Sequence, residues 1–258
     1  MSNGIEIVVA HHERATLRVG DLFLKVDTDR ERAGVEAGAL VLAPVPTPRV
    51  VWHEPPVLAV AAVPGVALGN YGEPSAGSAA DWAAAGAAVR RLHEAPLPPW
   101  PGRGPEELAA RLEEECAWLL ANGVLPADLV TVNRRAAETV LRPWTPVFAH
   151  GDLQPAHVFV DGGEVTGVID WSEAGRGPGL YDLAVLTLGH PEHLGDVLAG
   201  YGAGVDVEAV RGWWSYRALI AVRWLVEHGY DPAAPGCELD VLRARLTRSC
   251  RPAPGSCG

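Results

Sequence analysis

Apolar and polar residues alternate along much of the first sixty positions of the chain. Such alternation is typical of half-buried β-strands. The segments that carry it, or that add a short apolar run to it, are residues 5–9, 16–19, 22–26, 49–52 and 57–61. A helical pattern covers residues 31–42 and ends at the proline-rich stretch that follows. The pattern predicts a small antiparallel sheet with one helix.

Beyond Pro64 and Gly65 the pattern becomes mainly helical. The predicted helices are residues 78–93, 105–120, 127–141 and 211–229. Two short apolar strands joined by a Gly-Gly hairpin lie between the third and fourth of them. We therefore expect an α/β fold of the α+β type with two lobes. The sheet lobe would comprise residues 1–62, and a larger, mainly helical lobe would comprise residues 63–258.

The composition is that of a soluble globular protein. Of the 258 residues, 48% are hydrophobic and 21% are charged, which is enough to build a substantial core. The longest apolar run, residues 57–68, is broken by a Pro-Gly pair and is too short to span a bilayer. The amino terminus lacks the basic and apolar regions of a signal peptide. We expect a cytoplasmic protein without a membrane partner.

Charge and cysteine content narrow the class of partner. A net charge of −11 argues against nucleic acid, which requires a basic surface. Acidity is compatible with a cationic substrate, although on charge alone the simpler interpretation is that it provides solubility. The cysteines lack zinc-ligand spacing and fit a reducing compartment; they are Cys116, Cys237, Cys250 and Cys257. We expect a monomer or a weak dimer.

Two aspartates follow apolar segments in the second half of the chain. Asp152 stands in a His-Gly-Asp turn, and Asp170 comes eighteen positions later, at the end of the second hairpin strand. The hairpin would bring both carboxylates into one cleft. Phosphoryl transfer needs one aspartate to orient or deprotonate the attacking hydroxyl and another to hold magnesium. His157, five positions after Asp152, would complete the metal site. The alternative is a tight turn between two core strands.

These segments resemble the aminoglycoside phosphotransferase family, which consists of small-molecule kinases with the protein-kinase fold. The resemblance rests on residues 150–152, 158–160, 167–171 and 181–184. It implies a protein-kinase-like two-lobe fold, with ATP or GTP and Mg²⁺ as cofactors. It also implies that Asp152 is the catalytic base and Asp170 the metal-binding aspartate. His157 departs from most members, which have asparagine there, but macrolide kinases of the family also have histidine.

Lys25 is the only lysine in the chain, beside twenty arginines. It lies in the third predicted strand, where the resemblance implies a lysine that binds the nucleotide phosphates and is positioned by a glutamate from the next helix. Glu36 fits that partner role, and Glu31 competes for it. The alternative for Lys25 is a solvated charge at a strand edge.

The resemblance also indicates where nucleotide and acceptor would bind. The nucleotide ring would lie under the crossing between the lobes and hydrogen-bond the backbone near Ala61 and Val63. The predicted hairpin loop above it, residues 10–14, has no GxGxxG motif. The acceptor-binding candidates are Glu173, Trp224, Glu227 and Asp231. For the aromatic residues of the last long helix, the alternative is core packing.

The expected activity is transfer of the nucleotide γ-phosphate to a hydroxyl of a small molecule. An aminoglycoside-type antibiotic is the favoured acceptor, in keeping with a cationic partner and a role in resistance. Macrolide, cyclic-peptide and metabolic small-molecule kinases are the alternatives within this class. From another class, a nucleotide-binding module without turnover is suggested by His157 and by the missing glycine-rich loop.

Overall fold

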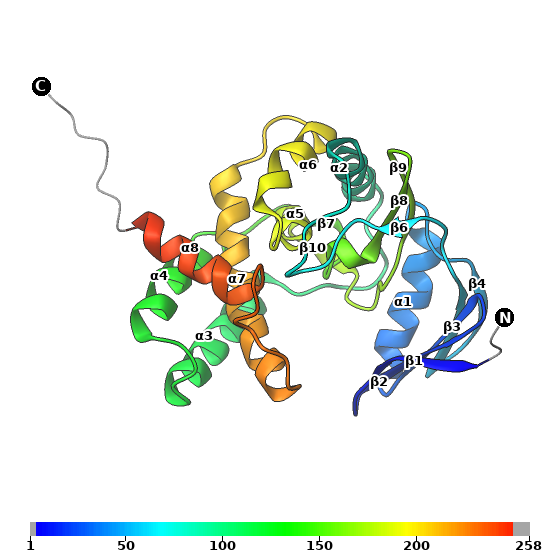
Figure 1. Ribbon diagram of the computed structural model, residues 1–258, viewed down its shortest axis with the longest axis horizontal. Helices are drawn as coiled ribbons and strands as arrows, with labels where there is room; N and C mark the ends of the chain where they lie inside the picture. Colours follow the sequence, from blue (N-terminus) through cyan, green and yellow to red (C-terminus); the bar gives the residue numbers. More distant parts are fainter. Residues whose placement is uncertain (1–3, 250–258) are drawn as a thin grey trace, which may run out of the picture.

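The small lobe is a five-stranded antiparallel sheet with one helix. The computed structural model describes residues 4–249 (Figure 1). The strand order is β1-β2-β3-β5-β4. The strands are β1 (Ile5–Ala10), β2 (Arg14–Val19), β3 (Leu22–Asp27), β4 (Val50–Glu54) and β5 (Val57–Ala61). All five predicted strands are present. Burial is concentrated in β5, whose three central residues are buried, whereas every residue of the edge strand β1 is exposed.

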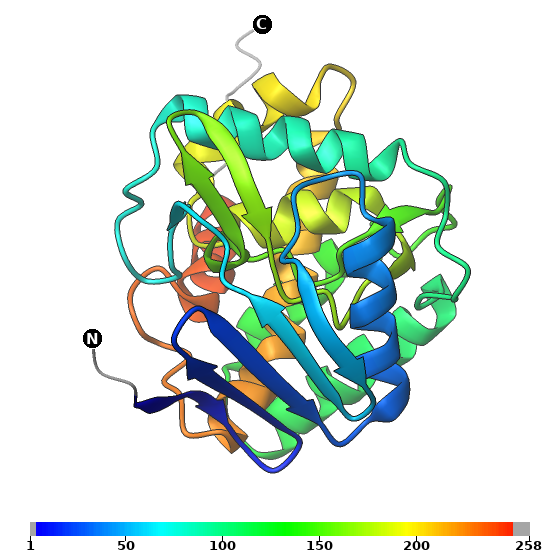
Figure 2. The same ribbon diagram turned by 90° about the vertical axis from the view of Figure 1, so that its right-hand side faces the viewer.

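Helix α1 (Arg30–Leu42) packs beside this sheet, against β3, β4 and β5 (Figures 1 and 2). Its first turn is capped by Asp29, whose carboxylate accepts from the amides of Glu31 and Arg32. Its buried residues recur at helical spacing: Ala33, Glu36, Ala37 and Leu40. Glu36 is thus a charged residue in an otherwise apolar stripe, which a helix keeps only when the charge has a partner.

The large lobe is built around helix α7 (Val207–Glu227), which contacts four other helices and runs through the middle of this lobe in Figure 1. The other helices are α2 (Ala79–His93), α3 (Pro105–Ala121), α4 (Ala127–Glu138), α5 (Gly179–Thr187), α6 (Leu194–Tyr201) and α8 (Glu238–Ser249). Short 3₁₀ turns occupy Pro155–His157 and Pro191–His193.

The ends of two predicted helices differ from the sequence expectation. Helix α7 begins four residues earlier than expected, because the Asp206 carboxylate accepts from the amides of Glu208 and Ala209 and caps it. Helix α4 stops at Glu138 rather than at residue 141. Pro143 lies just beyond, and a proline disfavours helical backbone in the residue before it.

Two small sheets position the loops that carry Asp152 and Asp170. Strands β6 (Val66–Ala67), β8 (Val158–Asp161) and β9 (Glu164–Val168) form one, and β7 (Val147–Ala149) pairs with β10 (Gly175–Gly177) in the other. The segment after Asp170 thus contains a short strand, β10. Because β7 and β9 end near each other in the large lobe, the residues that follow them, 150–152 and 169–170, come together.

A continuous apolar core underlies these loops, with Trp82, Phe148, Trp171 and Tyr216 fully buried. Cys116 and Cys237 are free thiols, and Cys250 and Cys257 lie outside the described residues. None of the described helices is long and apolar enough to cross a membrane. The division at residue 62 stays a prediction.

Candidate active site

His150 ties the loop that carries Asp152 to the loop that carries Asp170. Its ring Nε2 lies 3.0 Å from the carbonyl oxygen of Ile169, and its Nδ1 lies 3.3 Å from the amide nitrogen of Asp152. One neutral tautomer satisfies both contacts, with Nε2–H donating and Nδ1 accepting. Burial lowers the pKa of His150, which keeps the ring neutral.

Asp182 braces the same loop from below. Its carboxylate accepts from the amides of His150, at 2.7 Å, and Gly151, at 2.9 Å, and it pairs with His93 at 3.1 Å. Burial alone would raise the pKa of Asp182, but the hydrogen bond from His93 and the other partners lower it. This geometry indicates that Asp182 supports the loop and that His93, which also contacts Tyr201, has a structural role.

Gly151 cannot carry a side chain in this loop. Its φ is +84°, and a Cβ atom there would lie 2.2 Å from the carbonyl oxygen of Glu173. Only glycine adopts this conformation at so close an approach. The close packing fixes the position of the loop that carries Asp152.

Lys25 forms ion pairs with Glu36 and with Asp170, the latter at 2.8 Å. Only 14% of its side chain is exposed. Burial alone would lower the pKa of Lys25, but the two carboxylates raise it, so the ammonium stays charged. Glu31, the competing partner, lies exposed in the first turn of α1. The solvated strand-edge interpretation of Lys25 is therefore wrong.

Basic side chains surround the carboxylate of Asp170. Besides Lys25, its Oδ1 accepts from Arg14 at 3.2 Å, and its Oδ2 lies 3.7 Å from His157 Nε2. Burial would raise the pKa of Asp170, but Lys25, His157 and Arg14 hold it well below its usual range. Its backbone has φ +64°, a left-handed conformation that is uncommon for a residue other than glycine and is often found at functional sites.

His157 lies between the Asp152 loop and this carboxylate. Its Nδ1 lies 2.8 Å from the carbonyl oxygen of Asp152, which can only accept, so Nδ1 carries the proton. The other ring nitrogen, Nε2, faces the Asp170 carboxylate at 3.7 Å. Within residues 4–249, no group of three or more His, Cys, Asp or Glu side chains is placed to hold a metal ion. A metal here would have two protein ligands.

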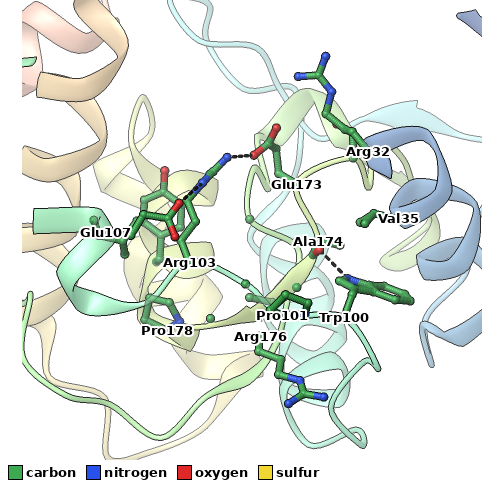
Figure 3. Close-up of a pocket in the computed structure, with 18 of the residues that line it drawn as sticks. Arg32, Val35, Trp100, Pro101, Arg103, Glu107, Glu173, Ala174, Arg176 and Pro178 are labelled. Carbon is green, nitrogen blue, oxygen red and sulfur yellow. Dashed lines mark hydrogen bonds and ion pairs between the residues drawn. The ribbon is translucent and has the colours of Figure 1, made fainter. Parts of the chain in front are cut away.

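Asp152 faces a cavity of about 430 Å³, called below the Asp152 cavity. Its walls come from the β1–β2 loop, the loops around Asp152 and Asp170, and helices α3 and α7. The carboxylate of Asp152 accepts from Gln154 at 3.0 Å and lies 3.5 Å from the Arg217 guanidinium. A second cavity of about 350 Å³ shares part of this wall, and Figure 3 shows Arg103 there between Glu107 and Glu173.

The four acceptor-binding candidates divide into two pairs. Glu173 and Trp224 line the Asp152 cavity, and Glu173 pairs with Arg103 at 2.7 Å. Glu227 and Asp231 are not among the described residues that line this cavity. Glu227 lies ten residues, about 15 Å of helix, beyond Arg217 and pairs with Arg223. Asp231 instead accepts from the amide of Ala233 in its own turn.

The inter-lobe crossing leaves backbone groups free for a ligand. The amide of Ala61 donates to the carbonyl of Arg49, and the amide of Ala62 donates to that of Asp21. Val63 has no backbone hydrogen bond to any described residue. Above the Asp152 cavity, the β1–β2 loop reaches α7, where the rings of His11 and Trp224 are 6.2 Å apart.

Sequence reasoning missed three arginines of this site. Arg14 binds Asp170, Arg217 lies beside Asp152, and Arg111 lines the same cavity. Arg217 had a detectable signal, because it falls on the same helical face as Trp213, Ile220 and Trp224. A charged residue in an apolar stripe of that kind indicates a buried partner or a ligand.

Comparison with known proteins is informative at the level of family and fold. The model of the phosphotransferase enzyme family matches residues 11–219. No curated protein matches the chain. A choline/ethanolamine kinase family protein from Mesorhizobium loti has a similar structure, with TM-score 0.68 and 21% identity over 96% of this chain and 87% of that chain.

Two antibiotic-modifying enzymes have the same fold. The GDP complex of aminoglycoside 2'-phosphotransferase-IIIa gives TM-score 0.70 at 17% identity, over 95% of this chain and 93% of that chain. A macrolide 2'-phosphotransferase from Brachybacterium faecium gives TM-score 0.61 at 18% identity, over 97% of this chain and 93% of that chain. The expected kinase-like two-lobe fold is thereby confirmed.

Proposed function

The chain belongs to the phosphotransferase enzyme family, and from this premise we propose that it transfers the γ-phosphate of ATP or GTP to a hydroxyl of a small molecule. One observation carries the proposal. Lys25, held by Glu36, meets Asp170 at 2.8 Å, and the loop linked to Asp170 presents Asp152 to a cavity. In this proposal, the residues that would bind phosphate, hold the metal and act as the base lie close to one another.

Asp152 acts on the acceptor hydroxyl in this proposal. It orients the hydroxyl and takes its proton as the oxygen forms a bond to the γ-phosphorus. The bond between that phosphorus and the bridging oxygen breaks, and a nucleoside diphosphate leaves. Lys25 and Arg14 are placed to bind the phosphate oxygens. The site therefore acts mainly by positioning and by charge neutralisation.

The donor groups fit a divalent cation bound together with the nucleotide. Asp170 Oδ2 and His157 Nε2 would hold it, with phosphate oxygens and water as the other ligands. The ion would neutralise charge on the phosphates. The ring would lie at the crossing, near Ala61 and the free backbone groups of Val63. Related structures contain GDP or ADP, and the choice between ATP and GTP stays open.

The class of acceptor is narrower than the fold alone implies. Similar structures include aminoglycoside, macrolide and choline/ethanolamine kinases, which supports a small hydroxylated acceptor. The sequence favoured an aminoglycoside-type, cationic antibiotic and a role in resistance. Arginines on the wall of the Asp152 cavity weigh against a polycation. The cytoplasmic location and the monomeric or weakly dimeric state stay predictions.

Release of ADP or GDP in the presence of Mg²⁺ tests the proposal. The acceptor panel comprises aminoglycosides, macrolides, cyclic-peptide antibiotics and simple sugars that differ in charge. The Asp152→Ala protein is measured beside the wild type. Acceptor-dependent release that is lost in Asp152→Ala supports the phosphotransferase. If the protein binds nucleotide but no panel member causes release of nucleoside diphosphate, the module without turnover is favoured.

Lys25→Arg should lower kcat/KM for the nucleotide about 10- to 100-fold. The ammonium is held between two carboxylates, and a planar guanidinium differs from it in reach and in the direction of its donors; contacts to charged groups have this magnitude. Steady-state kinetics at varied nucleotide concentration measures the effect. Arg18→Lys, on the exposed side of the neighbouring strand, is the control. An unchanged kcat/KM for Lys25→Arg would remove Lys25 from the nucleotide site.

A further inference from the structure

Positive charge gathers on the wall of the Asp152 cavity although the chain as a whole carries −11. Five arginines line this cavity, against three carboxylates. The arginines are Arg14, Arg32, Arg103, Arg111 and Arg217, and the carboxylates are Glu13, Asp152 and Glu173. Local charge at a cavity, rather than the net charge of the chain, determines which ligand charge it stabilises.

Three of the five arginines already have hydrogen-bonded partners. Arg14 donates to Asp170 and Ser172, and Arg32 forms two bonds of 2.8 Å to Asp27. Arg103 donates to Glu173 at 2.7 Å. These contacts neutralise the arginines nearest the small lobe, where the nucleotide phosphates are expected.

Arg217 and Arg111 are different. Arg217 donates no hydrogen bond to any described residue, although 15% of its side chain is exposed and its nearest carboxylate oxygens are 3.5 Å away in Asp152 and 3.8 Å away in Glu238. Arg111 has neither a hydrogen bond nor an ion pair among the described side chains. Guanidinium donors left without acceptors beside a cavity are strong binding groups for a ligand.

Tyr181 lines the same cavity as Arg217, Arg111 and Arg103. Burial raises the pKa of Tyr181 to about 12, even though Arg217, Arg111 and Arg103 are near enough to lower it. Tyr181 is therefore neutral and compensates none of this charge. Burial disfavours the charge of Arg217 as well, but Asp152 and the other neighbouring groups together outweigh burial and raise the pKa of Arg217, which stays cationic.

We propose that Arg217 and Arg111 bind an anionic group of the acceptor, a carboxylate or a phosphate, and so hold its hydroxyl at Asp152. The inference rests on the proposed function and specifies its substrate class. Guanidinium groups bind both anions through paired N–H donors. Ile220 and Ala221 of α7 add an apolar wall to the same cavity, which suits a carbon skeleton between the anion and the hydroxyl.

Binding of matched probes tests the anion site without turnover. D-gluconate, D-glucose 6-phosphate, D-glucose and D-glucosamine share a hydroxylated skeleton and differ in charge. Thermal unfolding is followed in the presence of Mg²⁺ and a non-hydrolysable ATP analogue, which fills the phosphate subsite at Lys25. At millimolar concentration, either anion should raise Tm more than glucose or glucosamine does. The carboxylate and phosphate arms show which anion the site prefers.

The arginine variants decide whether that binding occurs here. Arg217→Gln and Arg111→Gln should each weaken binding of the anionic probe at least about tenfold. Arg223→Gln, an exposed position on the same helix as Arg217, is the matched control and should bind like the wild type. Equal protection by anion in all three variants, or stronger protection by glucosamine, overturns the proposal. If Arg217→Gln does not fold, Arg111→Gln alone decides.

The two proposals can fail separately. Asp152→Asn should keep anion binding and lose acceptor-dependent nucleoside diphosphate release. Anion binding through Arg217 and Arg111 without Asp152-dependent release from any acceptor refutes the phosphotransferase and leaves the anion site in place. Release with cationic acceptors only, unaffected by Arg111→Gln, refutes the anion site and leaves the phosphotransferase in place.

Discussion

Asp152→Asn is expected to lower kcat by a factor of about 10²–10⁴ while the Kd for nucleotide stays near that of the wild type. The amide keeps the size of the side chain and its contact with Gln154, but it cannot accept the hydroxyl proton. Lys25, Arg14 and Asp170, the groups expected to bind the nucleotide, remain intact. Single-turnover release of nucleoside diphosphate measures the chemical step directly.

Asp161→Asn is a matched control for this change. Asp161 ends β8, only nine positions after Asp152, and its side chain is exposed. Its substitution should leave kcat unchanged. A wild-type kcat in Asp152→Asn would show that another group takes the proton, and a lost affinity for nucleotide would place Asp152 among the phosphate-binding residues.

Asp182→Ala is expected to destabilise the fold by about 3–5 kcal/mol, because it removes a buried carboxylate on which several buried donors depend. The substitution leaves the amides of His150 and Gly151 without an acceptor and His93 without its carboxylate. Because those amides position the loop of Asp152, the activity of the folded fraction should fall as well. Urea denaturation gives the free energy of unfolding.

Asp196→Ala provides the comparison at an exposed site. Its carboxylate is 34% exposed and pairs with His193, so the loss should stay below about 1 kcal/mol. A similarly small loss for Asp182→Ala would mean that water replaces the carboxylate between the two amides. The bracing role would then be wrong.

Acid should weaken the same brace. The partners of Asp182 lower its pKa below the ordinary 3.8, so the carboxylate contributes stability at neutral pH. That contribution is present above 3.8 and is lost as the pH falls through the lower folded-state pKa. The wild type should therefore lose more stability than Asp182→Ala over this acidic range.

Local sequence patterns predicted the elements and the segments that carry charge. Strand alternation placed Lys25, helical spacing placed Glu36, and the hairpin brought residues after β7 and β9 together. Each of these depends on residues close in sequence or on one strand connection. The role of each residue in the site stays a prediction, whereas their proximity is a property of the structure.

Local sequence patterns did not predict which residues would lie on the acceptor side of the site. Arg217 meets Asp152 across sixty-five positions, and Arg111 reaches the same cavity from another helix. Such meetings depend on how α3 and α7 pack in the large lobe, which side-chain periodicity does not encode. The expectation of a cationic acceptor came from the net charge of the whole chain. Most of that charge lies on residues that do not line the cavity, so it does not give the charge of the cavity wall.

Because Lys25 in β3 is the only lysine of the chain, opening of this strand can be followed by proteolysis. A lysine-specific protease has one peptide bond to cleave, the one after Lys25, and the neighbouring strands β2 and β5 pair with that segment on both sides. Cleavage therefore requires the sheet to open, and its rate measures how often β3 leaves its two neighbouring strands. The same side chain is the only one to which a lysine-directed acylating reagent can attach.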